Sequence, residues 1–145
     1  MDRNKINLDL ISKNTSPSLT NLKEFFESNK SDSFRYFDKR DFDVIENHKY
    51  TCLYSFNKDY IGYGHIDQEG DKNWLGIFIS ENYRGLGLGN LIMNDLISKS
   101  DVIHLTVDID NINAINLYKK IGFQECKKEN KYYLMVYKNK NKIDG

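Results

Sequence analysis

The chain has 145 residues, of which 39% are hydrophobic and 29% charged, as expected for a single globular domain. Lysine plus arginine and aspartate plus glutamate each total 21, so the chain lacks the basic excess that nucleic-acid binding needs. No run of about 18 apolar residues is present, which argues against a membrane helix. The N-terminus has no apolar signal core, so we expect a cytoplasmic protein.

Neither the cysteines nor the histidines show the spacing of a metal site. Cys52 and Cys126 lie far apart and outside any Cys-x-x-Cys pair, so we interpret both as reduced, half-buried strand residues. His48, His65 and His104 lack the His-x-x-x-His spacing. We therefore expect no metal in the functional site.

The N-terminal third predicts one strand, one helix and an irregular segment. Apolar and polar residues alternate over Ile6–Leu10, which predicts a strand. After Ser16 and Pro17, a pair suited to a helix start, apolar residues recur at helical spacing. Phe34–His48 is aromatic and charged, and we expect it to mix loop with a short helix.

The middle of the chain predicts an antiparallel meander of three strands. Three runs rich in aromatic and β-branched residues are separated by short polar turns. The runs are Tyr50–Phe56, Tyr60–Asp67 and Trp74–Ile79.

The remainder predicts helices alternating with strands. Apolar spacing indicates helices over Leu88–Ile97 and Ile112–Ile121. Strands are expected over Val102–Val107, Phe123–Lys127 and Tyr132–Tyr137. The order β-α-βββ-α-β-α-ββ predicts one α+β domain over residues 1–138, built on a largely antiparallel sheet. We expect residues 139–145 to form a flexible C-terminal tail.

The most informative segment is the glycine loop Arg84–Gly89, between an apolar strand and an amphipathic helix. Glycines at alternate positions remove side chains where backbone N–H groups emerge at a helix start, which suits a phosphate. Arg84 could add a charge-assisted contact. The loop does not match the dinucleotide pattern Gly-x-Gly-x-x-Gly, and it lacks the Gly-Lys-Ser/Thr of a P-loop.

Two motifs together resemble the GNAT superfamily of N-acetyltransferases. Arg84 begins an Arg-x-x-Gly-x-Gly loop after a strand. Asn111–Phe123 closely matches the later element Asn-x-x-Ala-x-x-Leu-Tyr-x-x-x-Gly-Phe. The resemblance extends from Tyr60 to Tyr137, and the N-terminal third matches only in its strand-helix order.

The resemblance implies a GNAT-like α+β fold, with a mixed, mostly antiparallel sheet of about seven strands flanked by about four helices. Two parallel strands, Trp74–Ile79 and Val102–Asp108, are expected to splay apart around the co-substrate acetyl-CoA. A bulge in the first, tolerated by Gly76, is expected to produce the splay. The residues implied to bind acetyl-CoA are Ile77, Phe78, Ile79, Arg84, Gly85, Leu86, Gly87, Leu88, Gly89, Asn111, Asn113 and Asn116.

The resemblance implies that the backbone of the first strand holds the pantetheine arm and the thioester. It also implies that an N–H there stabilises the oxyanion that forms when the amine attacks. Asn111 would cap its helix. Of Asn113 and Asn116, we expect one to contact the pantetheine or the nucleotide and the other to face solvent.

Tyr118 is the expected catalytic acid. It occupies the position where many members of the superfamily place a tyrosine near the sulfur. A phenol with a pKa near 10 is protonated at neutral pH and can donate to the departing thiolate. The alternative is that Tyr118 only packs with apolar residues on its helix face.

The general base is not assigned. Thr106 stands where some protein-modifying relatives carry a glutamate, and a threonine cannot serve as the base. Five other residues remain open as candidates: His65, Asp67, Glu69, Asp71 and Asp108.

The acceptor is expected to enter beside Phe34–Phe37, where aromatic residues and cations could bind a ligand or form a satellite core. Our first hypothesis is an N-acetyltransferase acting on a small-molecule amine or an amino sugar. The second is a protein N-acetyltransferase acting on an N-terminus or a lysine, against which Thr106 argues. The third is a non-enzymatic sensor of acyl-CoA. A homodimer is left open.

Overall fold

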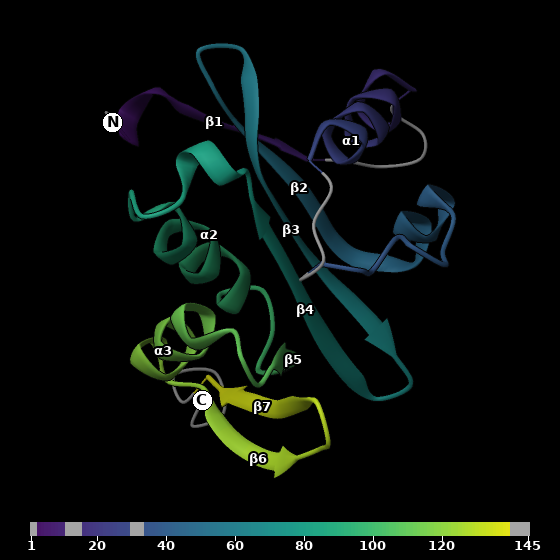
Figure 1. Cartoon of the computed structure of the whole chain (residues 1–145). Helices are drawn as coiled ribbons and strands as arrows, with labels where there is room; N and C mark the ends of the chain where they lie inside the picture. The colour runs from purple at the N-terminus through teal and green to yellow at the C-terminus, as the bar shows by residue number, and fades with distance from the viewer. Residues whose placement is uncertain (1–2, 11–15, 30–33, 140–145) are drawn as a thin grey trace.

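The computed structural model describes residues 3–10, 16–29 and 34–139. In these ranges seven strands form one mixed sheet in the order β1-β2-β3-β4-β5-β7-β6 (Figure 1). Of the neighbouring pairs, β4 and β5 are parallel and the others antiparallel. The strands are β1 (Ile6–Leu10), β2 (His48–Phe56), β3 (Asp59–Glu69), β4 (Lys72–Ile79), β5 (Val102–Asp108), β6 (Gln124–Lys128) and β7 (Tyr132–Lys138).

Helices cover both faces of the sheet, which confirms the predicted α+β fold (Figure 1). α2 (Leu88–Ile97) and α3 (Ile112–Ile121) lie on one face, and α1 (Ser16–Ser28) on the other. The short helix expected within Phe34–His48 is the 3-10 helix η2 (Phe42–Asn47). Two shorter 3-10 helices complete the described part, η1 (Arg3–Lys5) and η3 (Glu81–Tyr83).

The C-terminal end of the described chain remains tied to the sheet. The N–H of Asn139 donates to the carbonyl of Asp101 at 2.7 Å. Residues 140–145, to which the predicted tail extends, lie outside the described ranges. Among the helices that the structure describes, none is both long and apolar enough to span a bilayer.

The sheet separates two apolar cores, because strand side chains alternate between its faces. Ile77 and Ile79 of β4 pack against the larger core beneath α2 and α3. Phe78 points the other way, into a smaller core with Phe25 of α1 and Tyr63 of β3. Phe34 and Phe37 pack against this smaller core, so these aromatics do form the satellite core that the sequence left open. The smaller core fixes the chain that leads into η2.

Glycines in β3 allow α2 to approach the sheet closely. A Cβ on Gly62 would meet Ile92 Cδ1 at 2.7 Å, and one on Gly64 would meet Leu96 Cδ1 at 3.0 Å. Larger residues at either position would displace α2, whose N-terminus follows the glycine loop.

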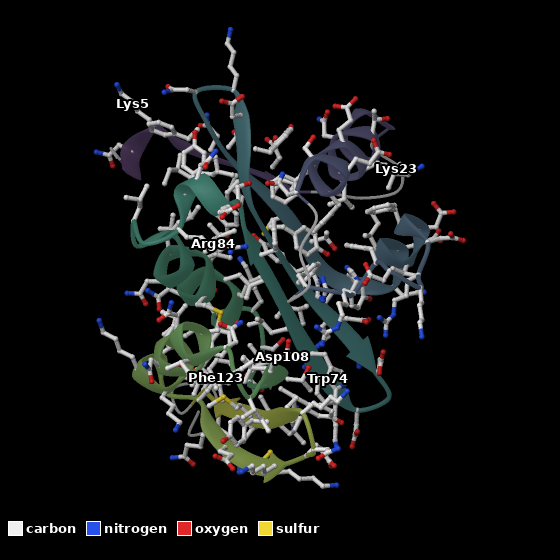
Figure 2. All side chains as sticks on the ribbon, in the orientation of Figure 1. Lys5, Lys23, Trp74, Arg84, Asp108 and Phe123 are labelled. Atoms are coloured by element: carbon white, nitrogen blue, oxygen red, sulfur yellow. The ribbon has the colours of Figure 1, made fainter. Side chains whose placement is uncertain are left out.

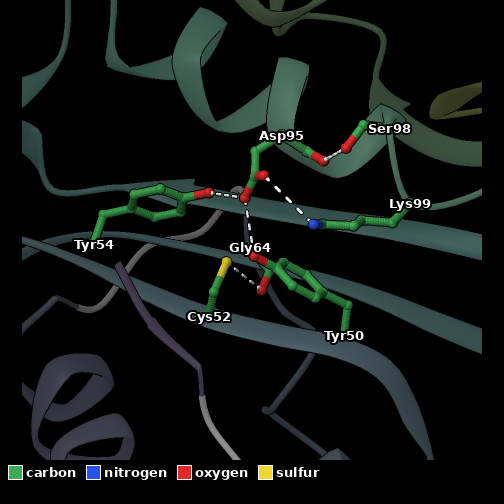
Figure 3. Close-up of polar contacts among 7 residues, drawn as sticks. All are labelled: Tyr50, Cys52, Tyr54, Gly64, Asp95, Ser98 and Lys99. Atoms are coloured by element: carbon green, nitrogen blue, oxygen red, sulfur yellow. Dashed lines mark hydrogen bonds and ion pairs between the residues drawn. The ribbon is translucent and has the colours of Figure 1, made fainter. Parts of the chain in front are cut away.

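A shared carboxylate also anchors α2 to β2 (Figure 3). Oδ2 of Asp95 accepts hydrogen bonds from the hydroxyls of Tyr50 at 2.9 Å and Tyr54 at 2.7 Å. Lys99 lies farther away, with its Nζ 3.8 Å from Asp95 Oδ1. Beneath them the buried thiol of Cys52 donates to the carbonyl of Gly64, and burial raises the pKa of Cys52 to about 12. Cys52 is therefore unreactive.

The other cysteine, Cys126, is exposed, so the sequence-based expectation that both are half-buried was wrong. The two differ because β2 lies inside the sheet and β6 forms its edge.

On the α1 face, a chain of hydrogen bonds joins the segment before η2 to the sheet. The hydroxyl of Tyr36 donates to Asp67 Oδ2 at 2.7 Å and lies 2.7 Å from His48 Nε2. His48 Nδ1 lies 2.7 Å from Thr51 Oγ1. Because Tyr36 donates its proton to Asp67, it must accept from His48 Nε2. His48 is therefore neutral with its proton on Nε2, and its Nδ1 accepts from the hydroxyl of Thr51.

Burial keeps all three histidines of the chain neutral. Desolvation lowers the pKa of His48 from 6.5 to about 4. For the fully buried His65, desolvation lowers the pKa well below 6.5, and the charge of Arg40, joined by that of His48 once His48 is protonated, adds to the effect. The pKa of His104 is also lowered, chiefly by desolvation.

We predict that Asp95→Ala lowers the free energy of unfolding by about 2 kcal/mol, because two tyrosine hydroxyls lose their charged acceptor. Urea denaturation measures this. Lys99→Ala is the matched control, since its exposed, longer ion pair contributes no more than about 0.5 kcal/mol. Equal losses in the two variants would show that the tyrosine bonds do not hold α2.

We predict that acid destabilises this fold before its carboxylates titrate. Between the unfolded histidine pKa of 6.5 and the folded value of about 4, the unfolded chain binds more protons, so stability falls as pH falls. From about pH 7.5 to about pH 5.5, His48 and His65 together should lower the free energy of unfolding by about 3 kcal/mol. Urea denaturation of His48→Gln should show about half this pH dependence, and an unchanged dependence would contradict the prediction.

Candidate active site

Strands β4 and β5 pair at one position only. Trp74 pairs with His104, and no later pair joins the two strands. The N–H of Ser80 donates to Ile61 on β3, so by alternation the backbone groups of Ile77 and Ile79 face β5. These groups are left without a strand partner, and the sheet is open along this edge.

The same alternation applies to β5. The N–H of Asn139 donates to Asp101, which places the backbone groups of odd-numbered β5 residues toward β7. Those of Thr106 and Asp108 therefore face β4. Two strand edges thus present backbone donors and acceptors toward each other without forming a ladder.

The bulge expected at Gly76 is absent. β3 and β4 keep a continuous register from Glu69↔Lys72 to Gly62↔Ile79. Gly76 instead accommodates the buried imidazole of His65, with which a Cβ at this position would collide. The glycine is needed for the close approach of this side chain rather than for a strand irregularity.

The glycine loop leads from β4 into α2, and its three glycines serve different purposes. Gly85 and Gly87 have φ values of 79° and 83°, in the left-handed region that disfavours other residues. Gly89 does not have a positive φ, but a Cβ there would lie 3.1 Å from Leu117 and 3.2 Å from Ile79. The first two shape the turn, and the third lets α2 pack against α3 and β4.

The N-terminus of α2 is open to an anion. Its first helical hydrogen bond runs from Leu91 N–H to Gly87 O, which leaves the N–H groups of Leu88, Gly89 and Asn90 without helical acceptors. No side chain caps this end. The helix dipole adds a partial positive charge at the same point. Leu88 can contribute only backbone, because its side chain is 1% exposed and part of the core.

Arg84 connects the loop to β4 (Figure 2). Its Nε donates to the carbonyl of Ile79 at 3.0 Å, and its guanidinium lies 5.5 Å from the centre of the Phe78 ring. The side chain is exposed, as are Gly85 and Leu86. Arg84 therefore brings a positive charge to the end of the open strand edge.

The start of α3 has the side-chain cap that the sequence predicts. Oδ1 of Asn111 accepts from the N–H of Ala114 at 3.4 Å, which confirms Asn111 as the helix cap. Asn113 and Asn116 are both exposed, one turn apart. Tyr118 is 9% exposed, and burial raises its pKa to about 12. Among the described residues, none hydrogen-bonds to its hydroxyl, which is protonated at neutral pH.

The five candidate bases do not form one cluster. His65 is buried, with Nδ1 2.5 Å from the Tyr63 hydroxyl, and Asp67 accepts from Tyr36. Glu69 and Asp71 are exposed on the β3–β4 hairpin. Asp108, labelled in Figure 2, accepts two hydrogen bonds from the Arg35 guanidinium, at 3.0 and 3.2 Å. The structure brings His65 and Asp67 together through Tyr36, whose ring centre lies 4.3 Å from that of His65.

Sequence reasoning missed the polar atoms where β4 and β5 meet. His104 Nδ1 and Asn73 Oδ1 are buried and have no hydrogen-bond partner among the described residues. The ring of His104 lies 5.4 Å from that of Trp74. No motif signalled them, because their proximity depends on the pairing of two strands. Across the described ranges, no three His, Cys, Asp or Glu side chains gather as metal ligands.

Two curated relatives share part of this chain. An N-alpha-acetyltransferase of Sulfurisphaera tokodaii is 35% identical over 65 residues, 41% of this chain and 39% of that protein. A spermine/spermidine N(1)-acetyltransferase of Bacillus subtilis is 38% identical over 65 residues, 40% of this chain and 43% of that protein. The matches thus span about two fifths of each relative.

Solved structures match the fold over nearly the whole chain. A GNAT-family acetyltransferase from Streptococcus pneumoniae has a TM-score of 0.72 at 20% identity, covering 92% of this chain and 99% of that one. The GNAT domain of S. lividans PAT has a TM-score of 0.78 at 12% identity, covering 92% and 90%. A sequence model of the Acetyltransferase (GNAT) family matches residues 18–123, and so the chain belongs to this family.

Proposed function

We propose that this protein is an acetyl-CoA-dependent N-acetyltransferase that acetylates a primary amine. One observation carries the proposal: the open edge of β4 ends beside an uncapped helix N-terminus, where Gly89 of α2 lies against Ile79. Such an arrangement suits a ligand with an extended amide-containing arm and a pyrophosphate at one end. Acetyl-CoA has both, and the family to which the chain belongs supports the assignment.

In the proposed complex, backbone groups bind most of the co-substrate. The open N–H groups of Leu88 and Gly89 would hold the pyrophosphate, with Arg84 adding charge. The outward-facing groups of Ile77 and Ile79 would pair with the pantetheine arm. An N–H at this edge would also stabilise the oxyanion that develops when the amine attacks. Phe78 is left out of this contact, because by the same alternation its backbone groups face β3 and its side chain packs in the α1-side core.

Tyr118 would act as the general acid. The neutral amine attacks the thioester carbonyl, a C–N bond forms, and the C–S bond breaks. The sulfur then takes the phenolic proton, and the excess proton on nitrogen leaves to a base or to solvent. The resulting phenolate regains a proton from solvent before the next turnover. The pKa of about 12 keeps this proton in place until the thiolate develops. The hydroxyl also has no competing acceptor among the described residues.

The acceptor we favour is a small molecule with a primary amine, either a polyamine or an amino sugar. The similarity to the Bacillus subtilis spermine/spermidine enzyme supports the polyamine. A protein N-terminus is the alternative, supported by the similarity to the Sulfurisphaera tokodaii N-alpha-acetyltransferase. An acyl-CoA sensor remains the non-enzymatic alternative, and whether two copies form a dimer stays a prediction.

The test of function is the release of free thiol from acetyl-CoA, with polyamines, amino sugars and peptides as acceptors. The assay uses Cys126→Ser, because this exposed thiol would contribute to the signal. Release with polyamines or amino sugars is expected. Release with peptides alone would favour the alternative, and acetyl-CoA binding without release would favour the sensor.

We predict that Tyr118→Phe lowers kcat by about 100-fold, the usual contribution of one general acid, with acetyl-CoA affinity unchanged. Steady-state kinetics and calorimetry measure the two quantities. The substitution removes only the hydroxyl, so the packing of α3 is kept. An unchanged kcat would exclude Tyr118 as the acid.

We predict that Gly85→Ala weakens acetyl-CoA binding by about tenfold. An alanine in the left-handed conformation that the loop requires costs about 1–2 kcal/mol, so the variant loop adopts its binding shape less often. Gly70→Ala is the matched control, since Gly70 also has a left-handed φ, 61°, and open space around it, but lies on the β3–β4 hairpin. Calorimetry should show a loss of affinity in the first variant alone. Equal acetyl-CoA affinities of the two variants would show that the loop does not bind the co-substrate.

A further inference from the structure

A pocket of about 520 Å³ lies between η2 and the end of the β3–β4 hairpin. The segment that precedes and forms η2 supplies one wall, and the last residues of β3 supply the other. Its lining includes two carboxylates, Asp67 and Glu69, together with the side-chain amide groups of Asn47 and Gln68. No role in the proposed acetyl transfer uses this pocket.

Asp67 is the central group of the pocket. It is 7% exposed, and its Oδ2 accepts the hydrogen bond from Tyr36. Within the described ranges no group donates to its Oδ1. Asp67 lines the pocket, so a ligand or solvent in the pocket can donate to this oxygen. The pocket therefore contains an acceptor that remains available.

The hydrogen bonds behind Asp67 reinforce its negative charge. Thr51 donates to His48, His48 to Tyr36, and Tyr36 to Asp67, so the three donors point in one direction. None of these groups carries a positive charge, because burial keeps His48 neutral. These hydrogen bonds orient the Asp67 carboxylate but do not neutralise its charge.

Arg40 is the one cation in the pocket lining, and its guanidinium is already engaged. It lies 4.3 Å from the centre of the Tyr36 ring, and its Nη1 donates to the Tyr36 carbonyl at 2.9 Å. Against one arginine stand the carboxylates of Asp67 and Glu69, so the lining carries a net charge of −1. The pocket therefore attracts a cation rather than an anion.

We propose that this pocket binds an ammonium group of the acceptor, and that the acceptor is a diamine or polyamine. This inference rests on the proposed acetyl transfer and specifies its substrate class. Asp67 of β3 pairs with Trp74 of β4, and Ile77 lies three residues farther along β4. At the rise of a strand this separation is about 10 Å, which an extended polyamine spans. One ammonium group occupies the pocket, and the other amine reaches the thioester.

The test is calorimetric titration of spermidine into the protein without acetyl-CoA, so that binding is measured apart from catalysis. Asp67→Asn should weaken binding by about tenfold, the loss of one charge-assisted hydrogen bond. Glu69→Gln, at an exposed pocket position, should weaken it by about twofold. Asp43→Asn, an exposed η2 carboxylate outside the lining, is the matched control and should bind as the parent protein does.

A second measurement remains valid if Asp67→Asn fails to fold. The KM for acetylation is compared across diamines from diaminopropane to diaminooctane and a monoamine of matched length. The parent should favour the longer diamines over the monoamine, and Glu69→Gln should reduce that preference. Equal KM values for diamines and monoamine, or equal binding losses in the Glu69 and Asp43 variants, would overturn the site.

The two proposals can fail separately. Acetylation of monoamines with no dependence on Asp67 would keep the proposed function and reject the pocket. Spermidine binding that depends on Asp67, without acetyl transfer to any amine, would keep the pocket and reject the function. Binding of sulfate in place of spermidine would show that Arg40 sets the charge of the pocket, and would overturn the inference.

Discussion

Backbone hydrogen bonds left unmade between β4 and β5 are the constraint on which the rest of this structure depends. The two strands pair at Trp74 and His104 and not beyond, so the backbone groups of Ile77 and the N–H of Ile79 lack partners in β5, while the Ile79 carbonyl accepts from Arg84. In a folded protein such groups need water or a ligand. On its other side β4 pairs with β3 in a continuous register, so it has no bulge there. The sheet can therefore hold an extended ligand without a bulge.

The open edge is useful only if α2 begins at its end, and several contacts fix that helix. Gly62 and Gly64 bring α2 close to β3, and Asp95 ties it to β2 through two tyrosines. Gly89 brings its first turn against α3 and β4. Because the N–H groups without helical acceptors belong to this first turn, their position follows from packing along the whole helix.

Different contacts hold the opposite face of the sheet, on which α1 lies. There the segment before η2 is held by aromatic packing and by the buried hydrogen-bond chain that ends at Asp67. Arg35 also reaches Asp108 at the end of β5, which links this segment to the open strand. Burial keeps His48 and His65 neutral within this arrangement. The proposed co-substrate site and the proposed cation pocket therefore depend on different parts of the sheet.

The sequence by itself determined the order of the elements, the glycine loop and the Asn111 cap, because apolar periodicity, turn residues and caps act over a few neighbouring residues. It did not determine the strand register, so the bulge expected at Gly76 was wrong. Only the tertiary structure decided that Asp67 meets Tyr36, 31 residues away, and that Asp108 meets Arg35, 73 residues away. Such pairs carry no local pattern, because their spacing in the chain is set by how distant strands and loops pack.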